Sequence, residues 1–284
     1  MKKKTMTLAS MTIAAGMLLG ACSEETSSSK GELEFAINNW AENVAVSNMW
    51  KVVLEEKGYE VKLTELEKAG VWTSVAEGDV DIAPEAWLPF TDEPFYKEYK
   101  DSIITGDSWY EGTGLGIAVP TYMSEVTTLE DLSNVSSELD GKIFGIEAGT
   151  SLMDISGTML EEYNLDYELV QSSEPAMLTE LKKAMDDESP VAVTLWNPHW
   201  AFAEYDIKYL EDPRGVYGEP DNIHYLAREG FDKDYPEVFD AFEAWELNDD
   251  QLGTLMKYIE DSSPEEGAKK WVEENQDLIT SWME

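Results

Sequence analysis

The regular alternation of short apolar runs with amphipathic stretches most constrains what this chain can fold into. The segment Glu32 to Asn38 predicts a strand, and Ala45 to Lys57 predicts an amphipathic helix that ends at Gly58. A second strand is expected over Tyr59 to Leu66. Strands that alternate with helices form largely parallel sheets covered by helices on both faces. The pattern therefore predicts an α/β fold.

The same rhythm occurs twice along the chain. The first run ends in an apolar strand over Leu115 to Val119, which Pro120 stops, and the second includes strands expected at Lys142 to Glu147 and Val191 to Trp196. A later strand near Ile223 leads into a helical tail from Pro236 onward. We therefore expect two lobes, each a sheet flanked by helices. One lobe would comprise residues 31–117 with 222–284, and the other residues 118–221.

The N-terminus predicts a targeting segment. Three lysines precede an apolar stretch, Met6 to Leu18, which is too short for a membrane span, and Leu19-Gly20-Ala21-Cys22 follows. This is the lipobox pattern of bacterial lipoproteins, and Cys22 is the only cysteine. We predict a signal peptide over 1–21, acylation of Cys22, a polar tether over 22–30 and a location on the extracytoplasmic face of the cell membrane. The alternative is an ordinary cleaved signal followed by a free thiol.

The charge of the chain is strongly acidic. It has 59 Asp and Glu residues against 20 Lys and Arg, for a net charge of −39. Nucleic-acid binding requires a basic surface, so a nucleic-acid partner is excluded. The acids are spread along the whole sequence, which favours adaptation to salt over a single cation-binding motif.

The sequence offers no catalytic constellation. It has two histidines, His199 and His224, no Cys/His cluster with metal-ligand spacing, and neither a nucleophile elbow nor a P-loop. We expect His199 to hydrogen-bond its own turn and His224 to be structural. The chain is therefore interpreted as a binding protein and not an enzyme, with no catalytic residue, metal or cofactor.

Three of the ten tryptophans stand out by position. Trp40, Trp87 and Trp196 each lie where an extended segment ends, and strand ends in α/β proteins open onto the ligand crevice. Converging indole faces would bind a cation without N–H groups, which in practice is a quaternary ammonium. From these residues alone, core packing is an equally good reading. Core packing is the default for four others, on predicted helices: Trp50, Trp245, Trp271 and Trp282.

Longer motifs carry a family resemblance. They are Ala86-Trp87-Leu88-Pro89, Asp-Gly-Lys-Ile-Phe-Gly-Ile-Glu at 140–147, Trp-Asn-Pro-His-Trp at 196–200 and Lys-Tyr-Leu-Glu-Asp-Pro at 208–213. With them the chain resembles, over nearly all of 31–284, the substrate-binding lipoproteins of glycine betaine and choline (osmoprotectant) ABC importers. The resemblance implies a two-lobed type II periplasmic-binding-protein fold with the ligand in the interlobe cleft. It also implies a trimethylammonium cage of Trp40, Trp87 and Trp196, and ABC permease and ATPase subunits as partners.

The polar end of the ligand leaves the solute open. In betaine-binding relatives, amides at positions matching Ser151 and Leu152 hold the carboxylate, although Thr150 would cap the same helix in any case. Those relatives commonly carry histidine at the position of Asp92, whereas choline-binding relatives carry an acid at the position of Glu42. Both acids would disfavour a ligand carboxylate and suit a hydroxyl. Glycine betaine and choline both remain possible, and the alternatives are a receptor for another amine or amino acid, or a lipid-anchored hydrolase.

Overall fold

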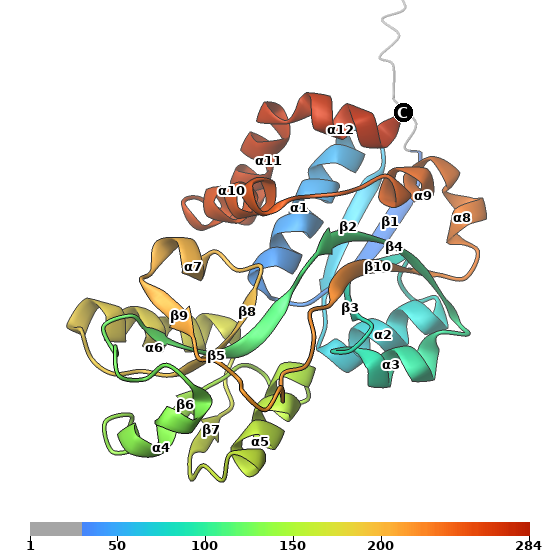
Figure 1. Cartoon of the computed structure of the whole chain (residues 1–284). Helices are drawn as coiled ribbons and strands as arrows, with labels where there is room; N and C mark the ends of the chain where they lie inside the picture. The colour runs from blue at the N-terminus through green and yellow to red at the C-terminus, as the bar shows by residue number, and fades with distance from the viewer. Residues whose placement is uncertain (1–29) are drawn as a thin grey trace, which may run out of the picture.

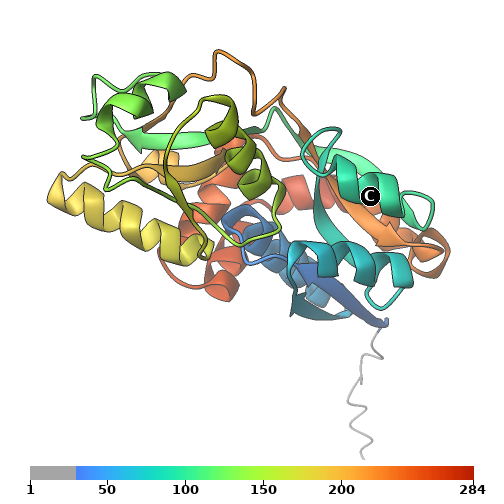
Figure 2. The same ribbon diagram turned by 90° about the horizontal axis from the view of Figure 1, so that it is seen from below.

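The computed structural model describes residues 30–284, and the signal peptide and Cys22 lie outside them. Lys30, which we expected to end the tether, already belongs to the folded body. Its backbone N–H donates to the Gly58 carbonyl at 2.9 Å, and its ammonium lies 2.7 Å from a Glu237 carboxylate oxygen. The body consists of two lobes, each built on a five-stranded sheet (Figures 1 and 2).

The first lobe is built on a mixed sheet. Its strand order is β2-β1-β3-β10-β4, in which β1, β2 and β3 are parallel and β10 is antiparallel to both of its neighbours. The strands are β1 (Glu32–Ile37), β2 (Glu60–Glu65), β3 (Ile82–Leu88), β4 (Ile103–Glu111) and β10 (Asn222–Arg228).

Alternation along β1 gives this sheet two apolar faces. Leu33, Phe35 and Ile37 point to one core cluster and Ala36 to another, as the period of two in a strand requires. On the first face lie α1 (Ala41–Glu56), α8 (Phe231–Asp234), α9 (Pro236–Glu243), α10 (Asp249–Glu260), α11 (Pro264–Glu274) and α12 (Gln276–Met283). On the second face lie α2 (Lys68–Glu77) and α3 (Glu93–Tyr99). Figure 1 shows α10 and α11 alongside α1.

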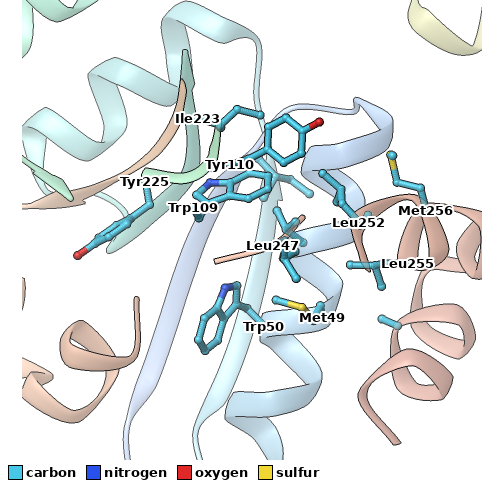
Figure 3. Close-up of a cluster of buried hydrophobic side chains, with 14 of the residues drawn as sticks. Met49, Trp50, Trp109, Tyr110, Ile223, Tyr225, Leu247, Leu252, Leu255 and Met256 are labelled. Atoms are coloured by element: carbon cyan, nitrogen blue, oxygen red, sulfur yellow. The ribbon is translucent and has the colours of Figure 1, made fainter. Parts of the chain in front are cut away.

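The larger core of this lobe is aromatic. Trp109 stacks on Trp245 with ring centroids 4.4 Å apart, and Trp50 stacks on Phe242 at 4.2 Å. Figure 3 shows Trp50 and Trp109 among the aliphatic side chains of α1 and α10. The expected core role is confirmed for Trp50, Trp245, Trp271 and Trp282, all of which are buried. Trp245, which was expected on a helix, lies two residues beyond the end of α9.

The second lobe repeats the design with shorter strands. Its order is β7-β6-β8-β5-β9. The strands are β5 (Gly114–Pro120), β6 (Lys142–Phe144), β7 (Glu168–Val170), β8 (Val193–Asn197) and β9 (Ile207–Tyr209). The helices are α4 (Leu132–Val135), preceded by a 3₁₀ turn at Leu129–Asp131, α5 (Ser151–Glu162), α6 (Glu174–Asp187) and α7 (Ala201–Glu204).

The chain crosses between the sheets at two adjacent places. The whole of β5 pairs in the second sheet, from Gly114 opposite Asn197 onward, so the expected boundary between 117 and 118 falls inside a strand. The crossing lies earlier, at Gly112 and Thr113, where a φ of 79° at Gly112 favours glycine. The return occurs before Asn222, the first residue of β10. Asp221 ties the two crossings together, because its N–H donates to Thr113 Oγ1 and its carbonyl accepts from the Thr113 N–H, both at 3.0 Å.

Some local expectations differ from the structure. The pattern did not predict α3 or β4. Within the expected helical tail, the chain is interrupted at Asn275, where φ is −120°, between α11 and α12. Among the helices of residues 30–284, none has the length and apolar character needed to cross a membrane.

Close packing at Gly106 provides a stability test. A Cβ there would overlap the ring of Tyr225, which is fully buried. We expect Gly106→Ala to destabilise the fold by about 1–3 kcal/mol through overpacking. Gly253 lies in α10 with no atom within 4 Å of a built Cβ, so Gly253→Ala should stabilise by up to about 1 kcal/mol. Urea denaturation of both variants checks this, and equal stabilities would contradict the packing described.

Candidate functional site

A cavity of about 350 Å³ between the two lobes, part of it open to solvent, brings the three strand-end tryptophans together. Trp40 and Trp87 come from the first lobe and Trp196 from the second. The cavity also includes every other residue that the sequence placed at the ligand: Glu42, Asp92, Thr150, Ser151 and Leu152. Lining residues that the sequence analysis missed are Lys68, Glu85, Thr91, Leu115 and Ile146.

Each tryptophan is fixed by the end of an element. Trp40 is the N-cap residue of α1, in the short turn after β1, whereas Trp87 and Trp196 are the next-to-last residues of β3 and β8. Trp87 and Trp196 are 4% and 3% exposed, and Trp40 is partly buried. The rings of Trp40 and Trp196 meet at 60° with centroids 6.3 Å apart. Indoles from different elements and different lobes therefore share one space.

Every indole N–H of this set donates to a glutamate. Trp196 Nε1 donates to Glu42 Oε2 at 2.8 Å, Trp87 Nε1 to Glu85 Oε1 at 2.6 Å, and Trp40 Nε1 to Glu147 Oε2 at 3.4 Å. A buried indole needs such an acceptor, and each bond fixes the orientation of its ring. Two of these bonds, from Trp196 and from Trp40, join one lobe to the other.

Glu42 and Glu85 are buried acids at this cavity. Burial, with Glu85 and Glu174 nearby, raises the pKa of Glu42 well above its usual range. Burial also raises the pKa of Glu85, against the opposing effect of Lys68. No protein hydrogen bond is made to Glu42 Oε1 or Glu85 Oε2 within the described chain, and both carboxyl groups line the same cavity. A hydrogen bond between the two carboxyl groups would require a proton on one of them.

Asp92 is compensated by a lysine that the sequence did not reveal. Lys68 Nζ lies 2.6 Å from Asp92 Oδ2, with the two side chains 4% and 1% exposed. The same Asp92 oxygen accepts the Trp87 backbone N–H at 2.8 Å, and Lys68 Nζ lies 5.1 Å from the centroid of the Trp40 ring. The ion pair corrects the view of Asp92 as an uncompensated acid: its repulsion of a ligand carboxylate is offset by Lys68.

The N-terminus of α5 gives the cavity amide donors. Thr150 caps the helix, accepting from Met153 N–H at 3.4 Å and donating to the Glu147 carbonyl at 3.0 Å. Ser151 and Leu152 are the first two residues of the helix. Amides of a first helical turn have no intrahelical acceptor, and they favour an anion.

A second polar contact between the lobes lies beside Trp196. Glu174 Oε2, on α6, accepts the Ala41 N–H of α1 at 3.0 Å, and its other oxygen lies 3.2 Å from His199 Nε2. His199 Nδ1 accepts the Ala201 N–H at 3.0 Å, so its expected role in the turn is confirmed. Because Nδ1 is an acceptor, the ring proton lies on Nε2 and donates to Glu174. Within residues 30–284, no group of three His, Cys, Asp or Glu side chains is arranged to hold a metal ion.

Comparison with known families identifies the architecture. The family model described as the substrate binding domain of the ABC-type glycine betaine transport system matches residues 31–274. The chain belongs to this family. Its fold is the two-lobed type II periplasmic-binding-protein fold, as the sequence predicted.

Individual members of the betaine-transport family are moderately similar. The glycine betaine/carnitine transport binding protein GbuC of Listeria monocytogenes is 35% identical over 155 residues, which are 53% of this chain and 52% of that protein. The chain thus matches about half the length of this curated relative. The structure of lactococcal OpuAC, closed and complexed with glycine betaine, superposes with a TM-score of 0.84 at 33% identity, covering 89% of this chain and 100% of that one. An ABC-transporter choline binding protein in complex with choline gives a TM-score of 0.80 at 26% identity, covering 88% and 91%.

The Lys68–Asp92 pair should be important for folding. Removing one partner leaves a buried charge unpaired, so Asp92→Ala should cost about 3–5 kcal/mol of unfolding free energy. The exposed pair Lys97–Glu93, at 2.7 Å, is the control, and Glu93→Ala should cost less than about 1 kcal/mol. Chemical denaturation of the two variants checks this, and an Asp92→Ala loss as small as that of Glu93→Ala would place Lys68 in solvent.

Glu42 should make stability depend on pH. The pKa of Glu42 is raised in the folded chain. In the unfolded chain Glu42 ionises above its ordinary pKa of about 4.3, so rising pH increasingly favours unfolding. Glu42→Gln keeps an acceptor for Trp196 and removes the charge, so its gain in Tm over the parent should grow from about pH 5 to about pH 8. Glu77→Gln, on the exposed side of α2, should show no such trend. A gain independent of pH would mean that Glu42 is ionised in the fold.

Proposed function

We propose that this chain is the extracytoplasmic receptor of an ABC importer. It captures a quaternary ammonium compound between Trp40, Trp87 and Trp196 and delivers it to a permease powered by ATPase subunits. Two acyl chains on Cys22 would hold it on the outer face of the membrane. Family membership supports the transport role, and the observation that carries the ligand class is the convergence of three indoles from two lobes on one buried cavity.

The physical fit of this cavity to a quaternary ammonium is good. Each desolvated aromatic face contributes about 0.5–2 kcal/mol to binding a cation. Burial of the methyl groups adds about 25 cal/mol per Å². All three indole N–H groups are occupied by glutamates, so the aromatic faces are what the rings offer to a ligand. A primary ammonium would lose hydrogen bonds to water on entry and be disfavoured.

Two solutes suit the polar part of the cavity. The amides at Ser151 and Leu152 would hold the carboxylate of glycine betaine. The buried Glu42 carboxyl would accept a hydrogen bond from the hydroxyl of choline. Similar structures are complexed with glycine betaine and with choline, and the similar GbuC is named for glycine betaine and carnitine. We propose that this chain takes both solutes at the same cage.

Two rival functions remain distinguishable. A receptor for another amine or an amino acid would bind a ligand with N–H groups at least as tightly as its trimethylated counterpart. A lipid-anchored hydrolase would turn over ester or amide substrates. Titration calorimetry with glycine betaine, choline, carnitine and proline betaine, together with a turnover screen, separates these possibilities.

The cage residues themselves should control affinity. Trp40→Ala, Trp87→Ala and Trp196→Ala should each weaken binding at least tenfold, or about 1.4 kcal/mol, because each removes one aromatic face. Trp271→Ala is the control, since Trp271 lies on α11 in the hydrophobic core. Its Nε1 donates to the Gln251 carbonyl at 3.0 Å. It should lower stability and leave the affinity of the folded fraction unchanged. Calorimetry on all four variants checks this, and three cage variants with parental affinity would place the binding site elsewhere.

A further inference from the structure

Glu42 and Glu85 form an unusual pair in the wall of the cavity that the three tryptophans line. They come from different elements, α1 and β3, and both are buried, at 0% and 1% exposed. Each gives one oxygen to an indole N–H, of Trp196 and of Trp87 respectively. Their other oxygens, Glu42 Oε1 and Glu85 Oε2, receive no hydrogen bond from any fixed donor in the described chain.

Two neighbouring buried carboxyl groups do not both ionise readily unless a cation lies beside them. Repulsion between like charges raises the pKa of one of the two carboxyl groups. The two titration steps are then properties of the pair and not of either residue alone. A single proton between Glu42 and Glu85 would satisfy both unpaired oxygens. The pair then carries one negative charge toward the cavity.

The cation that acts on the pair is already bound to another acid. Lys68, from α2, lowers the pKa of Glu85, but it is engaged by Asp92 at 2.6 Å, and Asp92 acts on Glu85 in the opposite direction. Glu174, from α6, adds a further acid, and its oxygens are taken by the Ala41 N–H and the His199 ring. From β8, the neutral indole N–H of Trp196 is the donor that faces Glu42. A positively charged ligand would therefore stabilise a second negative charge on the pair.

We propose that Glu42 and Glu85 share one dissociable proton, and that this proton sets the preference between a quaternary ammonium alcohol and a quaternary ammonium carboxylate. This inference rests on the proposed function. A bare cation beside the pair stabilises its doubly ionised form, so the proton leaves to solvent more readily when choline binds. A zwitterion adds a carboxylate of its own, which favours the protonated pair. A neutral carboxylic acid can also donate to that carboxylate.

The proton gives the two solutes opposite pH behaviour. Choline affinity rises with pH where binding releases the proton, by up to about tenfold per pH unit for one proton. Glycine betaine affinity stays level or falls over the same range. The ratio of choline to betaine affinity therefore increases with pH.

Titration calorimetry of the lipid-free chain tests this directly. Each solute is titrated between about pH 5 and about pH 8, in pairs of buffers with different ionisation enthalpies, to count the protons released. We expect more proton release with choline than with glycine betaine. Infrared difference spectra give a second readout, in which choline should diminish the C=O band of a protonated carboxyl group and betaine should leave it.

Matched variants assign the proton to this pair. Glu85→Gln keeps the side-chain shape and an acceptor for Trp87 but removes one acid, so the difference in proton release between the solutes should disappear. Glu77→Gln, exposed on α2, should retain it. Glu42→Gln is the second variant, with the same expected loss.

Each outcome decides one of the two ideas. Binding of both solutes with equal proton release, or an undiminished difference in Glu85→Gln and Glu42→Gln, would overturn the shared proton and leave the proposed function standing. Failure of the parent to bind any quaternary ammonium would overturn the proposed function and the shared proton with it.

Discussion

The hydrogen bond from the Trp196 indole to the buried Glu42 carboxyl is the contact on which the rest of the site depends. It joins the two lobes inside the cavity at 2.8 Å. Its partners are also part of the cavity wall, so the contact that closes the lobes also shapes the space for a ligand. Two further hydrogen bonds join the lobes at the N-terminus of α1, from Trp40 to Glu147 and from Ala41 to Glu174.

Few segments of the chain connect the two lobes that this contact joins. Only β4–β5 and the segment that leads into β10 connect the sheets, and Asp221 links these crossings to each other and to the loop after β3. Each lobe has an apolar cluster of its own, and a third cluster includes residues of both lobes. Polar bonds at residues of the cavity also join the lobes. A hydrogen bond in a protein contributes about 0.5–1.5 kcal/mol net, which is small enough for a ligand to shift the balance between open and closed lobes.

Sequence reasoning predicted the α/β architecture and the position of the tryptophans, because both follow from where apolar strands end. It failed on β4, because Thr105-Gly106-Asp107-Ser108 lacks the alternation of a strand and its one neighbour, β10, is far away in the chain. Lys68 could not be found, since its partner Asp92 lies on another element and only the fold brings them together. Glu85 left a usable signal, two residues before Trp87 on the same face of β3, which the abundance of acids obscured.

Closure on the ligand is the central physical claim, and small-angle scattering measures it most directly. The cavity is complete only when the lobes meet, so a ligand that binds there favours the closed form. The radius of gyration of the chain should fall when glycine betaine or choline is added to saturation. An unchanged radius, in a sample whose binding is confirmed by calorimetry, would show that the lobes do not close around the ligand and would contradict this account.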